Sequence, residues 1–157
     1  MCETCHSNHA IVKPLDSWVG TKEPALCVNC HSRNDNTRGF ETASAISNTI
    51  TKLVATHDEA KEVLEQAIEK GMMTTDEEFR LKEVDQILIQ TRTLVHAFNI
   101  DSVDEKAEEG LRKAELVERN SASLVNEYYF RRKGLGLTTL FITILVIALY
   151  FKIRQLG

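Results

Sequence analysis

The chain has 157 residues and a formal net charge of −4, a size that allows one ordinary domain or a small domain with appended helices. The near-balanced charge excludes the basic footprint expected of a nucleic-acid-binding protein. No paired carboxylates, nucleophile constellation or glycine-rich phosphate loop stands out, so no enzyme activity is expected. All four cysteines, both prolines and the only tryptophan precede residue 31, which sets a short N-terminal segment apart.

The cysteines occur as two pairs, and each pair is followed directly by a histidine. The two motifs are Cys2-x-x-Cys5-His6 and Cys27-x-x-Cys30-His31. Two thiols three residues apart can form thioethers with the two vinyl groups of one haem, and the next imidazole then lies beneath the iron as its proximal ligand. The pattern therefore predicts two covalently bound haems c, attached through all four cysteines and ligated by the two following histidines.

A structural zinc site is the alternative interpretation of these thiols. Two Cys-x-x-Cys pairs separated by 21 residues approach the spacing of a zinc ribbon. In a site of four thiolates, however, the two histidines that follow the pairs would have no role. Residues 1–38 contain few large apolar side chains, and a segment of that size usually needs a metal or a staple to fold. We therefore expect two haems to supply most of the core of a loop-rich module over residues 1–38.

The apolar pattern becomes helical after this module. Stripes of apolar residues spaced by three and four positions run along residues 46–67, 81–98 and 103–128. Gly71 separates the first two stripes, and capping-box patterns precede the second and third at Thr75-x-x-Glu78 and Ser102-x-x-Glu105. Because the first connection is short, the first two helices should be antiparallel neighbours. Residues 39–132 are thus predicted to form a helical hairpin followed by a third helix.

The run from Gly134 to Phe151 carries no charge over 18 residues. At 1.5 Å per residue it spans about 27 Å, which is most of a bilayer core. A buried core helix is the alternative, but the run has no amphipathic side and basic residues bracket it. The sequence therefore predicts a transmembrane helix over residues 133–152 with a short tail over residues 153–157.

The orientation of this helix is taken from chemistry, because the flanking charges are nearly balanced and lean the other way. Haem attachment normally takes place outside the cytoplasm, so we expect the haem module on the periplasmic side of the cell inner membrane. No signal peptide precedes Cys2. The start is therefore expected to be internal to a longer gene, or a leader is missing from this sequence.

Three stretches of the N-terminal segment resemble a known family. They are Cys2-Glu3-Thr4-Cys5-His6-Ser7-Asn8-His9-Ala10-Ile11, Pro14-Leu15-Asp16 and Cys27-Val28-Asn29-Cys30-His31, and they are similar to the doubled module of multihaem cytochromes c. Less specifically, Arg92-Thr93-Leu94-Val95-His96 and the anchor after Arg131-Arg132 resemble the tail of some such proteins. The resemblance implies a mainly α electron carrier, anchored in a membrane, that belongs to a larger haem array.

Three histidines remain as candidates for the distal iron ligands. The resemblance implies that His9, which cannot turn back onto the iron held by His6, reaches the neighbouring haem. The hairpin geometry would place His96 at the end nearest the haem segment and one step off the inner stripe. His57 is expected on that stripe, about 12 Å farther from the haems, as a hydrogen-bonded core histidine. We therefore predict His9 and His96 as distal ligands, and His57 as a ligand only to a partner's haem, if at all.

These features together predict electron transfer in a respiratory membrane complex. Haems whose axial positions are both closed by histidine carry single electrons, and the anchor would hold them beside a membrane donor such as a quinol-oxidising subunit. The expected partners are membrane or haem-bearing subunits and the lipid bilayer. Two alternatives stay open: a haem-bearing accessory subunit of an enzyme whose active site lies on another chain, and a tail-anchored structural zinc-ribbon protein.

Overall fold

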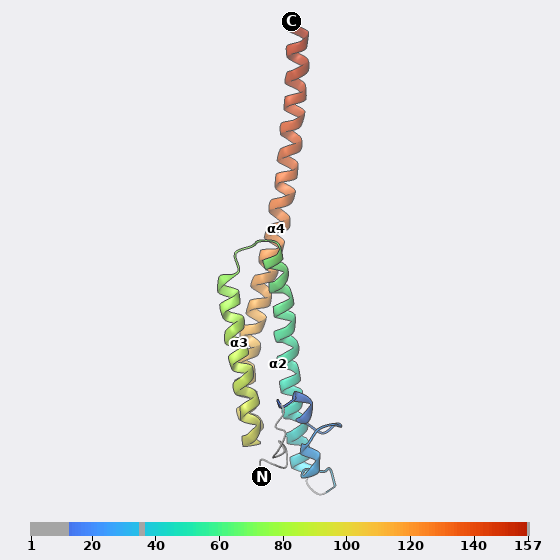
Figure 1. Cartoon of the computed structure of the whole chain (residues 1–157), viewed down its shortest axis with the longest axis vertical. Helices are drawn as coiled ribbons and strands as arrows, with labels where there is room; N and C mark the ends of the chain where they lie inside the picture. The colour runs from blue at the N-terminus through green and yellow to red at the C-terminus, as the bar shows by residue number, and fades with distance from the viewer. Residues whose placement is uncertain (1–12, 35–36, 157) are drawn as a thin grey trace.

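The chain folds into a bundle of three long helices, one of which extends far beyond the other two (Figure 1). The computed structural model describes residues 13–34 and 37–156, and within these ranges it contains helices and no strands. The elements are η1 (Asp16–Trp18), η2 (Cys27–Asn29), α2 (Thr37–Glu69), α3 (Thr75–Leu94), η3 (Val95–Ala97) and α4 (Ile100–Leu156). The mainly α fold with a small loop-rich N-terminal region is confirmed.

The hairpin of α2 and α3 forms because α2 ends at a glycine that accepts a left-handed conformation. Gly71 has a φ of 70°, its N–H donates to the carbonyl of Ile68 at 2.8 Å, and the N–H of Met72 donates to Ala67 at 3.1 Å. These two bonds satisfy the last carbonyls of α2 in a Schellman motif. The chain then reverses, so that α3 runs antiparallel to α2 (Figure 1).

The starts of α3 and α4 differ by a few residues from the predicted capping boxes. Thr74 rather than Thr75 precedes α3, and its hydroxyl donates to the carboxylate of Glu78 at 2.6 Å. At α4 the cap is Asn99 rather than Ser102. Its side-chain oxygen accepts from the N–H groups of Asp101 and Ser102 at 2.9 and 3.3 Å. Because Asn99 satisfies two donors of the first turn, α4 begins earlier than the sequence pattern suggested.

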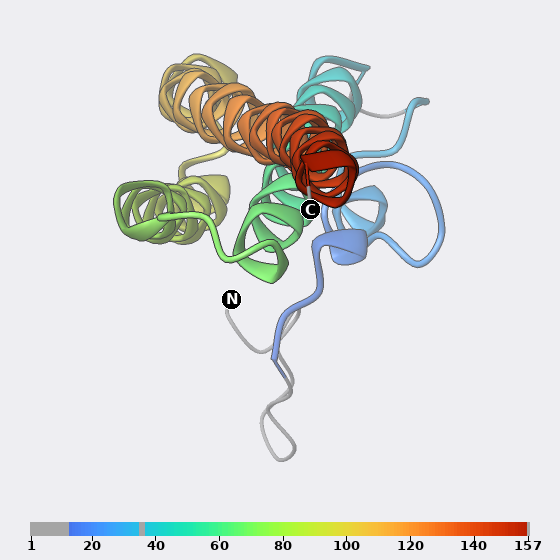
Figure 2. The ribbon, with the colours of Figure 1, turned by 90° about the horizontal axis from the view of Figure 1, so that it is seen from above.

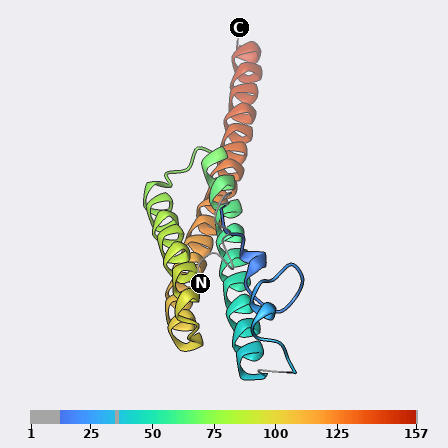
Figure 3. The same ribbon diagram turned by 60° about the horizontal axis from the view of Figure 1, so that its bottom comes forward.

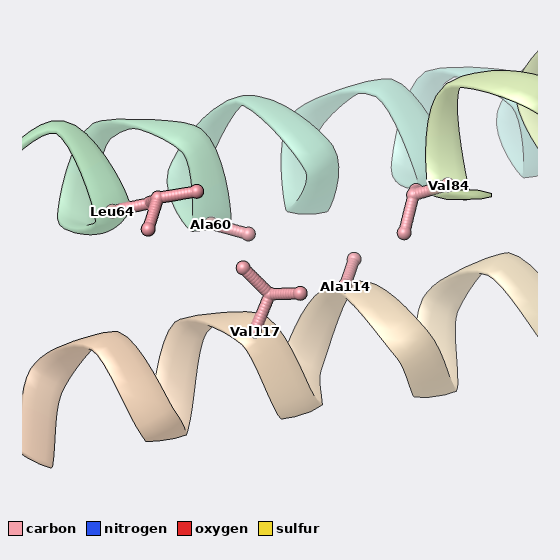
Figure 4. Packing of buried hydrophobic residues seen from close by; sticks show 5 residues of the cluster. All are labelled: Ala60, Leu64, Val84, Ala114 and Val117. Atoms are coloured by element: carbon pink, nitrogen blue, oxygen red, sulfur yellow. The ribbon is translucent and has the colours of Figure 1, made fainter. Parts of the chain in front are cut away.

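The core consists of three clusters that follow one another along the bundle. The predicted apolar positions of α2 are buried, apart from His57. One cluster joins α2, α3 and α4 through Ala60, Leu64, Val84, Ala114 and Val117 (Figure 4). The next contains Leu53, Leu88 and Ala107. The last, nearest the N-terminal segment, contains Ile46, Ile50 and Val103, with Val19, Val54, Leu94, Val95, Phe98 and Ile100 packed against it.

Helix α4 is continuous over 57 residues, so the predicted third helix and the apolar segment are one element. At 1.5 Å per residue it is about 85 Å long. Every residue from 131 to 156 is exposed, and α4 is long and apolar enough to cross a membrane. The α2–α3 connection lies at the end of the bundle from which α4 emerges, whereas the described N-terminal residues lie beside α2 near the opposite end (Figures 1, 2 and 3).

Candidate haem-binding site

The second Cys-x-x-Cys-His motif forms one tight helical turn. The N–H groups of Cys30 and His31 both donate to the carbonyl of Cys27, at 3.2 and 2.9 Å. Cys27 is half-buried, Cys30 is exposed, and both thiols are free of disulfide bonds. The turn therefore presents two thiols three residues apart with an imidazole directly after them. The residues of the first motif, Cys2, Cys5 and His6, lie outside the described residues, as does His9, so their roles stay predictions.

The segment around the second motif has little core of its own. Among the described residues 13–34, only Gly20 and Ala25 are buried. Gly20 has a φ of 124°, and a Cβ placed on it would lie 2.7 Å from the hydroxyl of Ser47 on α2, so the segment presses closely against that helix. The remaining side chains are half-buried or exposed. A thin core beside two thiols and an imidazole fits a covalently bound haem, which would supply the missing apolar contacts.

The end of α3 and the turn η3 pack directly onto this segment. The imidazole of His31 stacks on the ring of Phe98, with centroids 4.4 Å apart and planes 12° apart. The guanidinium of Arg92 donates two hydrogen bonds to the carboxylate of Asp16, at 2.7 and 2.6 Å. The bonds to Asp16 raise the pKa of Arg92 above its already high ordinary value. These contacts fix the second motif at the end of the bundle where α3 ends.

His96 lies in η3, at the same end of the bundle as His31. Its side chain is exposed, and its Nδ1 lies 3.1 Å from the carbonyl of Thr93. That hydrogen bond requires a proton on Nδ1, which in the neutral ring leaves the lone pair on Nε2. Histidines that ligate metals commonly donate their other ring N–H to a backbone carbonyl in this way. The ligand role of His96 stays a prediction, and this arrangement supports it.

His57 lies far from the second motif. Its Nε2 is 2.9 Å from a carboxylate oxygen of Asp85, which places it eleven residues along α3 from His96, or about 16 Å. This offset is a few ångströms larger than the expected value of about 12 Å. The side chain is 12% exposed, and its Nδ1 bonds to Asp58 at 2.9 Å.

The environment of His57 is polar, in contrast to the expected inner stripe. Its ring lies at the flank between α2 and α3, held between the carboxylates of Asp58 and Asp85. The contact to Asp85 has an ion-pair distance without the alignment of a hydrogen bond. Over residues 13–34 and 37–156, no group of three His, Cys, Asp or Glu side chains is arranged to hold a metal ion.

Sequence reasoning did not identify Asp16, Arg92 or Phe98 as residues of the site. Asp16 and Arg92 both lie in the short stretches that carry the family resemblance. Their presence in these stretches was the sequence signal that could have connected the two residues. Phe98 was placed on the apolar stripe of the second helix. Its stacking on His31 joins residues 67 positions apart, and no local pattern reports such a contact.

Comparison with known proteins supports the haem module. Residues 1–36 match the protein-family model described as "Doubled CXXCH motif". The match covers both motifs and ends where α2 begins, so the helical part lies outside it. No curated protein and no solved structure matches the chain significantly. The match supports a haem-binding module of the c type in the N-terminal segment, and such a module favours a carrier of electrons over a catalytic subunit.

Proposed function

We propose that this chain is the membrane-anchored, dihaem electron-transfer subunit of a respiratory membrane complex. The observation that carries the proposal is the doubled motif at residues 1–36, placed on a bundle whose last helix continues into an apolar segment. Haem c is attached outside the cytoplasm, which supports an extracytoplasmic module. The inner membrane is the one we propose for the anchor, with the tail after Lys152 on the cytoplasmic side.

Each residue of the proposed site has a defined task. Bound haem iron would supply one-electron chemistry, because a low-spin iron with two histidine ligands changes charge without binding substrate. Phe98 covers one face of the His31 imidazole and restricts its rotation, and the Arg92–Asp16 contact holds the end of α3 against the module. The proposed thioether residues are Cys2, Cys5, Cys27 and Cys30, the proximal ligands His6 and His31, and the distal ligands His9 and His96.

The proposed partners are membrane or haem-bearing subunits of the same complex. Four histidine ligands for two irons would leave no coordination position open for substrate, so any active site of the complex would lie on another chain. A haem-bearing accessory subunit of such an enzyme would show the same features in this chain. The zinc-ribbon alternative predicts bound zinc and no covalent haem.

The number of covalent haems tests the proposal directly. We expect denatured, acid-acetone-extracted protein to keep its haem absorbance and to show a mass excess of two haems, because thioether bonds survive both treatments. The double variant Cys27→Ala/Cys30→Ala should lose one haem, and the matched variant Cys2→Ala/Cys5→Ala should lose the other. A polypeptide of unmodified mass would contradict the proposal, and stoichiometric zinc in that protein would favour the zinc ribbon.

A further inference from the structure

The second haem motif and the apolar segment lie at opposite ends of the bundle. His31 stacks on Phe98, two residues before α4 begins at Ile100. The uncharged segment of the same helix begins at Gly134. From residue 100 to residue 134, α4 rises 34 steps of 1.5 Å, or about 51 Å. A membrane around the apolar segment would therefore lie about 50 Å from the second motif.

The intervening structure is braced along most of its length. Polar contacts between helices recur from one end to the other: Thr49 to Asp104 at 2.6 Å, Glu83 to Lys113 at 2.9 Å, and Glu77 to Asn120 at 2.8 Å. The three apolar clusters lie between them. Proline is a common cause of sharp helix kinks. Both prolines of the chain precede α2, so none lies in α2, α3 or α4. The bundle can therefore hold the second motif at a fixed distance from the membrane.

Tilting does not bring the motif to the membrane. Transmembrane helices tilt by about 20° on average and up to about 40°, and at the larger angle the height would still be about 39 Å. The headgroup region on one side of a bilayer takes up only about 5–8 Å of this. Electron tunnelling falls exponentially with distance, so a gap of this size needs an intermediate redox centre. All cysteines of this chain precede residue 31, so no further covalent haem can attach along α2, α3 or α4.

We infer that the haem at Cys27 and Cys30 exchanges electrons with a one-electron redox centre in the aqueous compartment, roughly 40–50 Å above the hydrocarbon core of the bilayer, and not with a quinone dissolved in the lipid. The inference rests on the proposed function and names the class of its partner. The partner would be an extramembrane haem domain or a soluble carrier. Asn29, inside the attachment turn, is exposed.

The height of the haem can be measured by the quenching of fluorescent dyes. In the holoprotein every native thiol is bonded to haem, so an introduced cysteine is the only one that a dye can label. Glu41 and Glu69 are both exposed and lie near opposite ends of α2, 28 residues or about 42 Å apart. Glu41→Cys and Glu69→Cys therefore form a matched pair of labelling sites. A third dye is attached to a lipid headgroup in the proteoliposome.

We expect the dye at position 41 to lose several-fold more of its fluorescence than the dye at position 69, and the lipid dye to lose least. The comparison is repeated in Cys2→Ala/Cys5→Ala, which keeps only the second haem. Equal quenching of the lipid dye and the dye at position 41 in that variant would overturn the inference. The haem content of each preparation is measured alongside, and a preparation without haem would instead overturn the proposed function.

The route of the electrons is tested with two quinones that share one ring. Proteoliposomes of the full chain are reduced with dithionite and freed of excess reductant. They are then mixed with a quinone that carries a long isoprenoid tail or with its tail-less, water-soluble counterpart. Each quinone takes two electrons, one from each of two haems, and two protons to form the quinol. We expect the tail-less quinone to oxidise the haems many-fold faster. Equal rates at equal concentrations would contradict the inference.

Discussion

At the scale of single residues, the stacking of Phe98 on His31 explains an unusual backbone conformation. Phe98 has a φ of 49°, in the left-handed region that a bulky residue rarely adopts and that costs on the order of 1–3 kcal/mol. Its ring packs against the cluster of Ile46, Ile50 and Val103 and covers the imidazole at 4.4 Å. Burial and ring stacking together offset such a cost. The imidazole is thus oriented before any haem binds.

The two histidines that lie on α2 and in η3, His57 and His96, should respond differently to substitution. His96→Ala should convert one haem to a high-spin or water-ligated form, because removal of a distal imidazole opens the sixth position of the iron. The change would be visible in the ferric spectrum and as new binding of carbon monoxide. His57→Ala should leave both haems low-spin and lower the free energy of unfolding by about 1–3 kcal/mol, since it empties a mostly buried site beside two carboxylates.

The matched pair also shows how the ligand assignment can fail. A spin-state change in His57→Ala with a silent His96→Ala would mean that the wrong histidine was chosen. If both variants keep low-spin haems, the ligands come from His9 and from a partner chain. A His96→Gln variant should behave like His96→Ala, because an amide is a poor replacement for imidazole on haem iron.

At the scale of the helices, α4 approaches both of its neighbours at a single glycine. A Cβ on Gly110 would lie 2.8 Å from a methyl group of Leu53 on α2 and 3.0 Å from a methyl group of Ile87 on α3. Leu53 is fully buried, so its side chain has little room to move. Gly110→Val should therefore destabilise the bundle by about 1–3 kcal/mol through overpacking. Chemical denaturation of the full chain in detergent would measure it, with Glu105→Val on the exposed face as a near-neutral control; equal effects would contradict the close approach.

The helices were largely predictable because their burial follows local spacing. The stripe of α2 agrees with the buried positions from Ile46 to Ala67, since a repeat of three and four places side chains on one face. Helix starts were less predictable: Asn99, a single cap residue outside the pattern, moved the start of α4 by three residues. In the candidate haem-binding site, only the Cys-x-x-Cys-His motifs were predictable from the sequence. The Arg92–Asp16 and Phe98–His31 contacts depend on how distant segments pack, which spacing does not encode.

At the scale of the whole molecule, α4 leaves the bundle as a helix suited to lipid. Three threonines in the apolar segment donate their hydroxyls to the carbonyls of Gly134, Leu135 and Thr139 at 2.8–2.9 Å, so these polar groups are satisfied within the helix. Beside the bundle, the ammonium group of Lys70 lies 5.6 Å from the ring of Tyr129, and tyrosines and basic residues suit the membrane interface. Helix α4 therefore has two physically distinct parts, one that packs in the bundle and one that is suited to lipid.

Extraction and protease digestion should separate these two parts. Alkaline carbonate should fail to strip the full chain from membranes, because the residues after Gly134 stay in the lipid. A chain ending at Lys133 should be soluble and keep the helical signal of the bundle, since the buried positions of α4 end at Ser121. A protease added on the extracytoplasmic side should leave only a short membrane-protected C-terminal fragment. Protection of the haem segment would reverse the proposed topology, and release of the full chain by carbonate would show that α4 does not span the bilayer.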